Sequence, residues 1–185
     1  MRMLAFDTCL GATSAAVLHV DHAGDHAQII ARRAEPMQRG HAERLLPMIA
    51  EVLSEACVAA GDVDRIAVTE GPGTFTGIRT GVAAARALAL ATGKPVMATT
   101  SLALLAATAR RLGSAPVPGA PLVVALDARK SEIYLQVLEA DGRAATPALV
   151  LSPADGVRRL TALGIAAPLG VIGSGAPALI AAAPP

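Results

Sequence analysis

The sequence predicts an α/β protein in which parallel strands are covered by helices. The first observation is an alternation of short apolar runs and helical runs along the middle of the chain: 65–69, 76–92, 95–99 and 101–112. The second is a restart of the opening pattern after a stretch rich in Pro, Ala and Gly at 113–121. Such a repeat indicates two related domains joined by a hinge. We therefore expect a first domain at 1–113 and a second, small or incomplete one at 114–185.

The chain should open with three strands, because Gly11 and the polar stretch 21–25 separate short apolar runs. These runs are Met3 to Thr8, Ala12 to Val20 and Ala27 to Ala34. A helix is expected next, since its apolar residues recur at helical spacing. They are Ala42, Leu45, Leu46, Ile49, Val52, Leu53 and Ala56. Pro47 lies inside this stripe, so the helix is either kinked or begins near Leu46.

The second half of the first domain is marked by glycine and proline. The short strand at 65–69 enters a glycine-rich turn, and the helix at 76–92 follows directly. Gly93 and Pro95 terminate this helix. A further strand and helix, at 95–99 and 101–112, should complete the domain.

The second copy begins with an apolar strand that ends in Asp127, as the first strand of the chain ends in Asp7. A polar turn and a returning strand at 132–138 follow in the same order. Beyond them we expect only one helix, about Pro153 to Leu163, and one strand, Leu169 to Ile172.

Composition excludes several classes of protein. The formal net charge is +1 and aromatic residues make up 2%, so Ala, Val and Leu must form the core. Because the chain has neither an excess of basic residues nor a set of aromatic side chains to stack on bases, it is a poor candidate for binding single-stranded nucleic acid on its own. Repeated Gly and Pro interrupt the uncharged stretch 160–185, which argues against a membrane span. Cys9, Cys57 and the lack of a signal peptide fit a reducing cytoplasm.

The turn after the strand at 65–69 resembles a phosphate cradle without matching one. A strand, a glycine-rich turn and a helix start can together hold an anion, because the first helical amides point outward. However, no Gly-Lys-Ser/Thr follows, and Gly71, Gly73 and Gly77 miss the dinucleotide spacing by one residue. Asp7 could hold a metal ion or orient a water molecule, but capping the free amides of its turn is the favoured role.

Small residues recur every four positions along the following helix, which aligns them on one face. They are Gly77, Gly81, Ala85, Ala89 and Gly93. Because glycine inside a helix costs about 1 kcal/mol relative to alanine, the row needs a structural reason. Either a helix of another chain approaches closely there, with Arg79 and Arg86 at the rim, or the row packs on the protein's own sheet. Both explanations remain open.

No signature of catalysis or metal binding stands out. His41 begins a helix, but Leu45 occupies the place where a second histidine would complete a metal-binding pair. One hairpin turn carries five residues of the types that bind metal ions: His19, Asp21, His22, Asp25 and His26. Polar residues are expected in a hairpin turn in any case, so this cluster does not by itself indicate a metal site. Cys9 has no local base to activate it, so we expect a half-buried thiol. We assign no catalytic residue and no metal ligand.

Taken together, these residues identify the chain as a member of the TsaB (YeaZ) family. The segment 71–81, Gly-Pro-Gly-Thr-Phe-Thr-Gly-Ile-Arg-Thr-Gly, resembles that family's signature. Supporting segments are Leu4 to Thr8, His41 to Pro47, Thr99 to Leu102 and Leu126 to Arg129. The resemblance implies an actin, sugar-kinase and Hsp70-like fold, made of two ribonuclease-H-like domains.

The resemblance also implies a function. Proteins of this family pair with TsaD and TsaE to modify the adenosine 3′ of the anticodon in tRNAs that read ANN codons. It implies a non-catalytic scaffold that forms a homodimer without TsaD, meets tRNA only indirectly and has no cofactor of its own. ATP or ADP would then bind at a subunit interface of the complex. The alternatives are a small-molecule kinase of this fold, a glycoprotease-type metallopeptidase, or a module that only self-associates.

The candidate site residues follow from the family's interface, which is formed by its first two helices. We expect partner contacts at His41, Leu45, Ile49, Val52, Gly77, Arg79, Gly81, Ala85 and Arg86. The candidates for nucleotide proximity are Asp7, Thr8, Gly71 and Gly73. Two departures from the family pattern stand beside them: Cys9 replaces the usual Ser, and the sequence stops soon after Gly175. The second domain is therefore expected to be incomplete or trimmed.

Overall fold

The computed structural model describes residues 1–21, 26–115, 119–165 and 170–184. The chain divides into two compact units, Met1–Ser101 and Leu102–Pro185. The sequence placed the boundary at residue 113, whereas here the helix that follows Thr100 groups with the second unit. Each unit contains one mixed sheet and its own core.

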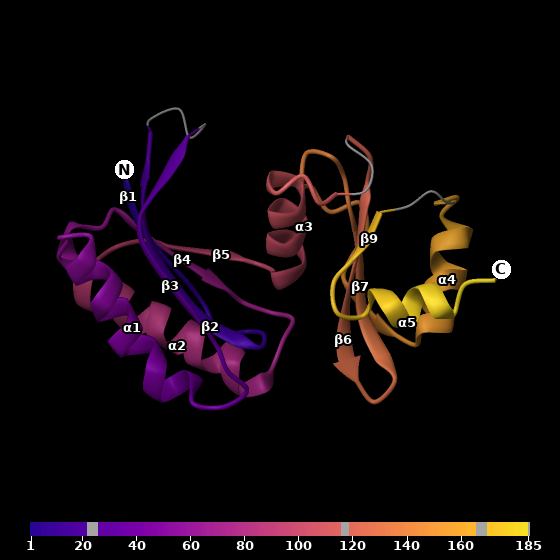
Figure 1. Ribbon diagram of the computed structural model, residues 1–185, viewed down its shortest axis with the longest axis horizontal. Helices are drawn as coiled ribbons and strands as arrows, with labels where there is room; N and C mark the ends of the chain where they lie inside the picture. Colours follow the sequence, from indigo (N-terminus) through magenta and orange to yellow (C-terminus); the bar gives the residue numbers. More distant parts are fainter. Residues whose placement is uncertain (22–25, 116–118, 166–169, 185) are drawn as a thin grey trace. The chain divides into compact units, whose positions relative to one another are not determined.

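The first unit contains a five-stranded sheet in the order β3-β2-β1-β4-β5 (Figure 1). Its strands are β1 Arg2–Asp7, β2 Ala12–Val20, β3 Ala27–Pro36, β4 Arg65–Thr69 and β5 Val96–Thr99. The first three strands are antiparallel to one another, and β4 and β5 run parallel to β1. The carboxyl ends of β1, β4 and β5 therefore meet at one edge of the sheet.

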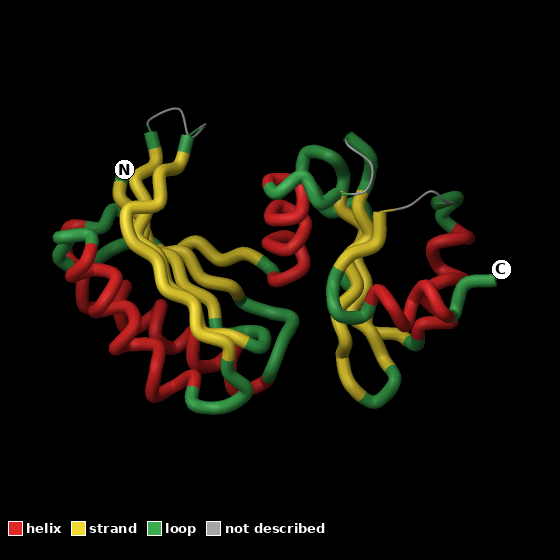
Figure 2. Tube along the Cα trace, in the orientation of Figure 1, coloured by secondary structure: helices red, strands yellow, loops and turns green. Residues whose placement is uncertain are grey.

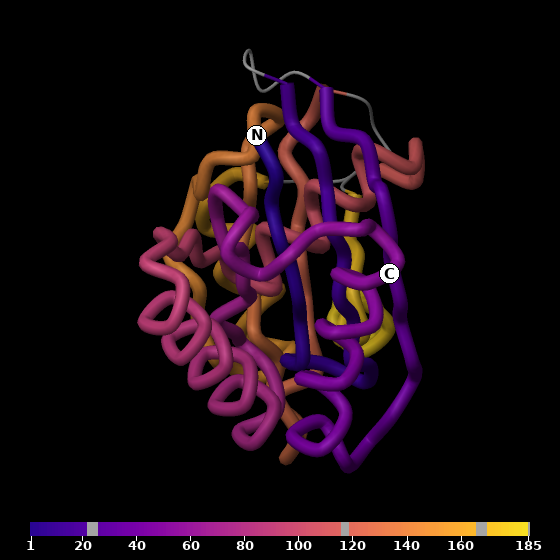
Figure 3. The backbone as a smooth tube through the Cα atoms, turned by 90° about the vertical axis from the view of Figure 1, so that its left-hand side faces the viewer, coloured from indigo at the N-terminus to yellow at the C-terminus, as the bar shows by residue number. Residues whose placement is uncertain are grey.

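Two helices, α1 His41–Glu55 and α2 Phe75–Thr92, contact each other on one face of this sheet. Figure 3, turned by 90° from Figure 1, shows the helices beside the strands that they cover. A single turn of 3-10 helix, Ala60–Asp62, connects α1 to β4. The core of the unit lies between the helices and the sheet, where alternate residues of β1, β2 and β4 are buried.

The ends of both helices follow from local sequence. Helix α1 begins at His41, ahead of Pro47, so the alternative start near Leu46 is wrong. Helix α2 begins after Thr74, whose side-chain hydroxyl accepts a hydrogen bond from the Gly77 amide at 3.2 Å. It ends at Gly93, which adopts the left-handed conformation with φ 70°.

The second unit has a four-stranded sheet in the order β8-β7-β6-β9. Its strands are β6 Leu122–Arg129, β7 Glu132–Leu138, β8 Leu149–Leu151 and β9 Gly170–Ile172. Its helices are α3 Ser101–Arg111, α4 Pro153–Ala162 and α5 Ala176–Ala181. The expected strand start at Leu169 lies outside the described residues. The expectation of only one helix and one strand beyond β7 is wrong, because β8 and α5 are also present.

Both units contain the same run of elements, three strands, a helix, a strand and a helix, to which β5 is added in the first unit and α3 in the second. Figure 2 shows the strands and helices of both units by colour. Strands β6, β7 and β8 correspond to β1, β2 and β3, helix α4 to α1, strand β9 to β4, and helix α5 to α2. In each sheet the strand after the first of these helices joins the first strand in parallel. The predicted α/β fold with a duplicated, smaller second domain is thereby confirmed. Among the described residues, no helix has the length and apolar character needed to cross a membrane.

Candidate functional site

The glycine-rich turn between β4 and α2 packs directly on the end of β1. The Thr74 amide donates a hydrogen bond to the Cys9 carbonyl oxygen at 2.7 Å. A Cβ atom placed on Gly73 would lie 2.1 Å from that same oxygen, so no residue larger than glycine fits. Gly71 has a φ of 101°, which L side chains rarely adopt, and its carbonyl accepts a hydrogen bond from the Ser101 amide at 2.8 Å. The turn is held against the protein's own backbone.

The small residues of α2 also face this unit. The Thr8 hydroxyl donates to the Gly77 carbonyl oxygen at 2.6 Å, and a Cβ atom on Gly77 would lie 1.9 Å from the Thr8 carbonyl oxygen. A Cβ atom on Gly81 would lie 2.9 Å from the Thr8 Oγ1, and Ala85 is buried in the core. Of the two explanations for the row, the structure supports packing on the protein's own sheet. Gly77, Gly81 and Ala85 are not exposed for a partner, which corrects their assignment as docking contacts.

Asp7 caps the turn that follows β1. Its Oδ1 accepts a hydrogen bond from the Cys9 amide at 2.9 Å and a second one from the Thr69 hydroxyl. Asp127 does the same in the second unit, where its Oδ1 accepts from the Arg129 amide at 2.8 Å. Both carboxylates therefore cap their turns, which is the role that the sequence favoured for Asp7.

The Cys9 side chain is fully buried behind the same turn. Its sulfur lies 3.3 Å from the Thr69 hydroxyl oxygen, which in turn donates to Asp7. Burial is the main cause that raises the pKa of the Cys9 thiol, so the thiol form dominates at neutral pH. A thiol in this state is a poor nucleophile. The sequence predicted a half-buried thiol, whereas the structure buries it completely.

In the second unit a glycine-containing turn packs on the first strand as well, but on a residue within β6 rather than beyond the strand's end. The Gly175 amide donates to the Ala125 carbonyl oxygen at 2.9 Å, as the Thr74 amide does to Cys9. A Cβ atom on Gly173 would lie 2.2 Å from the Ala125 oxygen. The Ser174 hydroxyl accepts a hydrogen bond from the Asp127 amide at 3.0 Å. The β-strand, turn and helix of each unit are thus joined by main-chain contacts of the same kind.

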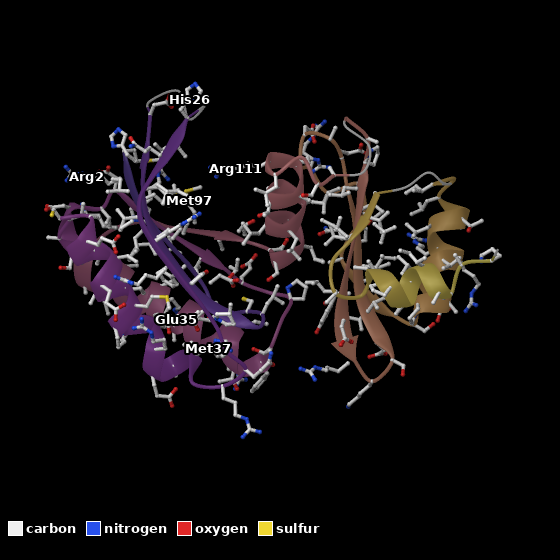
Figure 4. All side chains as sticks on the ribbon, in the orientation of Figure 1. Arg2, His26, Glu35, Met37, Met97 and Arg111 are labelled. Atoms are coloured by element: carbon white, nitrogen blue, oxygen red, sulfur yellow. The ribbon has the colours of Figure 1, made fainter. Side chains whose placement is uncertain are left out.

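The candidate contacts on α1 are buried too. His41 is 4% exposed, and its Nδ1 lies 2.8 Å from the Thr13 hydroxyl, which also lies 3.1 Å from the Met37 sulfur (Figure 4 labels Met37). Leu45, Ile49 and Val52 belong to the core of the first unit. These four residues face the sheet, so they are not available as surface contacts, and the expectation that they meet a partner is corrected.

The outward face of α2 presents different residues. Arg79 and Arg86 are exposed, and the Arg79 guanidinium stands 3.6 Å from the centre of the Phe75 ring. Phe75 is itself 68% exposed and Leu90 is 89% exposed. Sequence reasoning named the arginines and missed the two apolar residues. The available signal was their position on α2 opposite the glycine row.

A charged network joins the edge strand β3 to α1. The Arg44 guanidinium contacts Glu35 (labelled in Figure 4) at 2.5 Å and Glu51 at 2.7 Å, and Arg33 pairs with Glu51 and Glu55. Hydrogen bonds from Arg44 hold the pKa of Glu35 and of Glu51 below the usual range. Sequence analysis did not reveal this network, because its partners on β3 are separated from α1 along the chain.

No metal site is formed within the described ranges. Groups of three or more His, Cys, Asp or Glu residues that could hold an ion are absent there. Of the polar cluster in the hairpin between β2 and β3, His22 and Asp25 lie outside those ranges.

Comparison with known proteins identifies relatives that are similar to this chain in sequence and in structure. A family model described as TsaD, tRNA N6-adenosine threonylcarbamoyltransferase, matches residues 28–167. The threonylcarbamoyladenosine biosynthesis protein TsaB of Haemophilus influenzae is 37% identical over 134 residues, and that of Escherichia coli is 32% identical over the same length. Each alignment covers 72% of this chain but 52% or 53% of the relative, so the chain spans about half the length of these curated relatives.

Two solved structures resemble the whole chain. YeaZ from Pseudomonas aeruginosa is 34% identical with a TM-score of 0.78, and the match covers 100% of this chain and 80% of that one. A second Pseudomonas aeruginosa structure, of an uncharacterized protein with similarity to peptidase YeaZ, is 32% identical with a TM-score of 0.74. It covers 98% of this chain and 89% of its own. Both units therefore contribute to the likeness.

Proposed function

Because the chain belongs to the TsaB (YeaZ) family, we propose that it is a non-catalytic subunit that binds TsaD and TsaE during threonylcarbamoylation of tRNA. The modified nucleotide in this proposal is the adenosine 3′ of the anticodon in tRNAs that read ANN codons. TsaD supplies the catalytic site, and this chain forms a homodimer when TsaD is missing. The observation that carries the proposal is the likeness to TsaB and YeaZ proteins along both units.

The contacts in the turn after β1 support the non-catalytic role that we propose. The Asp7 carboxylate and the Thr8 hydroxyl are both engaged in hydrogen bonds within the first unit. The Cys9 thiol is buried and protonated. Since Thr8 and Cys9 are fully buried, a substrate cannot reach these two side chains without a change in the fold, which favours a structural role for them.

Nucleotide and tRNA enter the proposal only through the complex. The glycine-rich turn packs on the Cys9 carbonyl, which favours a structural role for Gly71 and Gly73 over direct phosphate binding. We place ATP or ADP at a subunit interface, near the half-buried Asp7 rather than the fully buried Thr8, and give the isolated chain no cofactor. The formal net charge of +1 fits indirect contact with tRNA. The complex in this proposal is cytoplasmic and has no membrane contact.

Deletion of the gene tests the proposal most directly. We expect bulk tRNA from the deletion strain to lose threonylcarbamoyladenosine in nucleoside analysis by mass spectrometry, and this chain expressed from a plasmid to restore it. Purified chain should elute together with TsaD of the same genome on a sizing column. Unchanged modification in the deletion strain, or two separate species on the column, would overturn the proposal.

The isolated chain also distinguishes this function from the enzyme alternatives. A small-molecule kinase of the same fold would turn over ATP on its own, and a metallopeptidase would retain one metal ion per chain. We expect neither ATP hydrolysis nor stoichiometric metal from the purified protein. Either activity would replace the subunit role with an enzymatic one.

A further inference from the structure

Three buried polar atoms lack a hydrogen-bond partner in the part of the chain that the structure describes, and all three lie on or beside helix α3. They are Ser101 Oγ, Arg110 Nη1 and Gln136 Oε1. Ser101 is the first residue of α3, and Arg110 lies in its last turn. Because most buried polar groups in folded proteins form hydrogen bonds, three exceptions around one helix require an explanation.

Gln136 lies on the side of the second sheet that faces α3. Its neighbours on β7, Leu135 and Val137, point into the core that includes residues of α4 and α5, so Gln136 points to the opposite side. Figure 1 shows α3 on that side of the sheet, and α4 and α5 on the other. Gln136 is 8% exposed, and its Nε2 donates to the Thr146 carbonyl oxygen at 3.1 Å. Its Oε1 finds no donor among the described residues.

The buried face of α3 ends in an arginine. Leu102, Ala106 and Arg110 recur every four residues and therefore share one side of the helix. Leu102 and Ala106 are 0% and 1% exposed. The Arg110 Nη2 donates to the Leu138 carbonyl oxygen at 3.1 Å, which attaches the last turn of α3 to β7, but the buried Nη1 has no acceptor within the described ranges. Burying a donor of a charged group without an acceptor is unfavourable.

The Ser101 hydroxyl is buried at the opposite end of α3. Ser101 is 2% exposed, and its amide donates to the Gly71 carbonyl oxygen at 2.8 Å. Burial raises the pKa of the Cys9 thiol, and the nearby Thr69 and Ser101 hydroxyls partly oppose this effect. No hydrogen bond of ordinary geometry joins the Ser101 hydroxyl to that thiol, which is in any case a weak partner. Both ends of α3 therefore bury a polar atom that would bind water if the helix moved.

We infer that α3 is a releasable helix, which opens locally while the rest of each unit stays folded. In the docked state three polar atoms are without partners, whereas in the released state each of them binds water. The missing hydrogen bonds therefore reduce the free energy that release requires. Release also uncovers Leu122 and Val124, which are buried on the same side of the sheet as Gln136, and this keeps the docked state the major one. The inference goes beyond the proposed function and does not depend on it.

The place of α3 in the chain gives this opening its consequence. The division between the two compact units falls between Ser101 and Leu102, so α3 begins where the second unit begins. Its contacts at the two ends are the hydrogen bond from the Ser101 amide to Gly71 and the hydrogen bond from Arg110 to Leu138. Release of α3 loosens both. A ligand that contacts only one of the two states shifts their populations, so α3 is a conformational device built into the fold.

Hydrogen exchange of the native full chain tests the inference. Exchange would be read by mass spectrometry at increasing urea concentrations below the unfolding transition. We expect peptides from α3 to exchange through an opening that depends weakly on urea, and about tenfold or more faster than peptides from α2. Exchange of both helices only through global unfolding, with the same dependence on urea, would overturn the inference.

Removal of an unpartnered atom should hold α3 in place more firmly. Ser101→Ala deletes the buried hydroxyl and keeps the amide bond to Gly71, and Gln136→Met replaces the amide by an apolar group of similar shape. Each should slow exchange in α3 about fivefold or more. Thr108→Ala is the matched control, because it deletes from the same helix an exposed hydroxyl that donates to the Leu104 carbonyl oxygen. It reports the effect of the helix propensity of alanine alone.

The variants can also contradict the inference. Equal slowing in Ser101→Ala and Thr108→Ala would assign the effect to helix propensity. Faster exchange in Ser101→Ala than in the wild type would show that the hydroxyl has a partner in solution. Either result would overturn the inference.

Thiol labelling gives a second measurement that leaves the three polar atoms in place. Ala106 of α3 and Ala85 of α2 are each 1% exposed, so the thiol introduced by Ala106→Cys or by Ala85→Cys reports the opening of its own helix. Both changes would be made in a Cys57→Ser background, in which the remaining native thiol, Cys9, is buried. We expect labelling at position 106 to be about tenfold or more faster than at position 85. Equal rates at the two positions would show that α3 opens no more easily than α2 and would overturn the inference.

Discussion

Replacement of Gly77 by alanine tests how closely α2 packs against the end of β1. The added Cβ atom would lie 1.9 Å from the Thr8 carbonyl oxygen and 2.6 Å from the Thr74 Oγ1. The first of these neighbours is backbone, so helix and strand must separate by about 1 Å before the contact becomes tolerable. That movement also lengthens the 2.6 Å hydrogen bond from the Thr8 hydroxyl to the Gly77 carbonyl.

The magnitude follows from three opposing effects. Alanine gains at most about 1 kcal/mol over glycine, which is the value for a helix interior, because Gly77 lies in the first turn of α2. Overpacking costs about 1–3 kcal/mol, and the weakened buried hydrogen bond costs about 1 kcal/mol more. We expect a net loss near 2 kcal/mol in the free energy of unfolding and a fall in Tm of about 10 °C for a unit of this size.

The assay is thermal and urea unfolding of the full chain, followed by circular dichroism. Hydrogen exchange by mass spectrometry should show faster exchange in peptides from α2, because its contact with β1 is loosened. Gly61→Ala is the control, since a Cβ atom there would meet nothing within 4 Å. Stability equal to the wild type at position 77 would refute the packing argument. If the Gly77→Ala variant were as stable as the wild type but no longer bound TsaD, the glycine row would again be assigned to the partner interface.

Three other predictions concern the same unit. Thr8→Val should lower the free energy of unfolding by about 1 kcal/mol, measured by urea titration, because a buried hydrogen bond is lost; an unchanged value would show that this bond contributes little. A colorimetric thiol reagent should label exposed Cys57 rapidly and buried Cys9 only on unfolding, and two rapid thiols in native protein would contradict the described burial. Arg44→Gln should destabilise the protein above the ordinary glutamate pKa of 4.5, because Arg44 lowers the pKa of Glu35 and Glu51. That difference is present above pH 4.5 and disappears as pH falls below it, since protonated carboxyls no longer bind Arg44; a pH-independent difference in denaturant titrations would argue against the ion network.

Most helices and strands could be located from the sequence because glycine and proline mark where they end. Gly93 ends α2 where it was expected, and β4 matches its expected bounds. The missed elements are short. Strand β8 has three residues, too few to show a period, and Pro177, which suggested a break, lies in the first turn of α5 where proline is tolerated.

The candidate site was harder to predict because its contacts join distant segments. The spacing of Gly77 and Gly81 revealed a close approach, but not the neighbour, which is Thr8, 69 residues before Gly77. The same uncertainty applied to Leu45 on α1. A helical stripe of apolar residues shows that a face is covered, and only the fold shows whether the covering surface belongs to the same chain.

The glycine-containing turns after β4 and β9 are held in place by hydrogen bonds between main-chain atoms, which every amino acid possesses. Carbonyl oxygens of Cys9 and Ala125 accept hydrogen bonds from the turn in the two units, and each leaves no room for a side chain at Gly73 or Gly173. Cys9 and Ala125 can therefore serve the same purpose although their side chains differ, because only a main-chain oxygen of each takes part in the contact. A change of side chain at either position leaves this hydrogen bond in place, whereas a change of glycine at the turn does not.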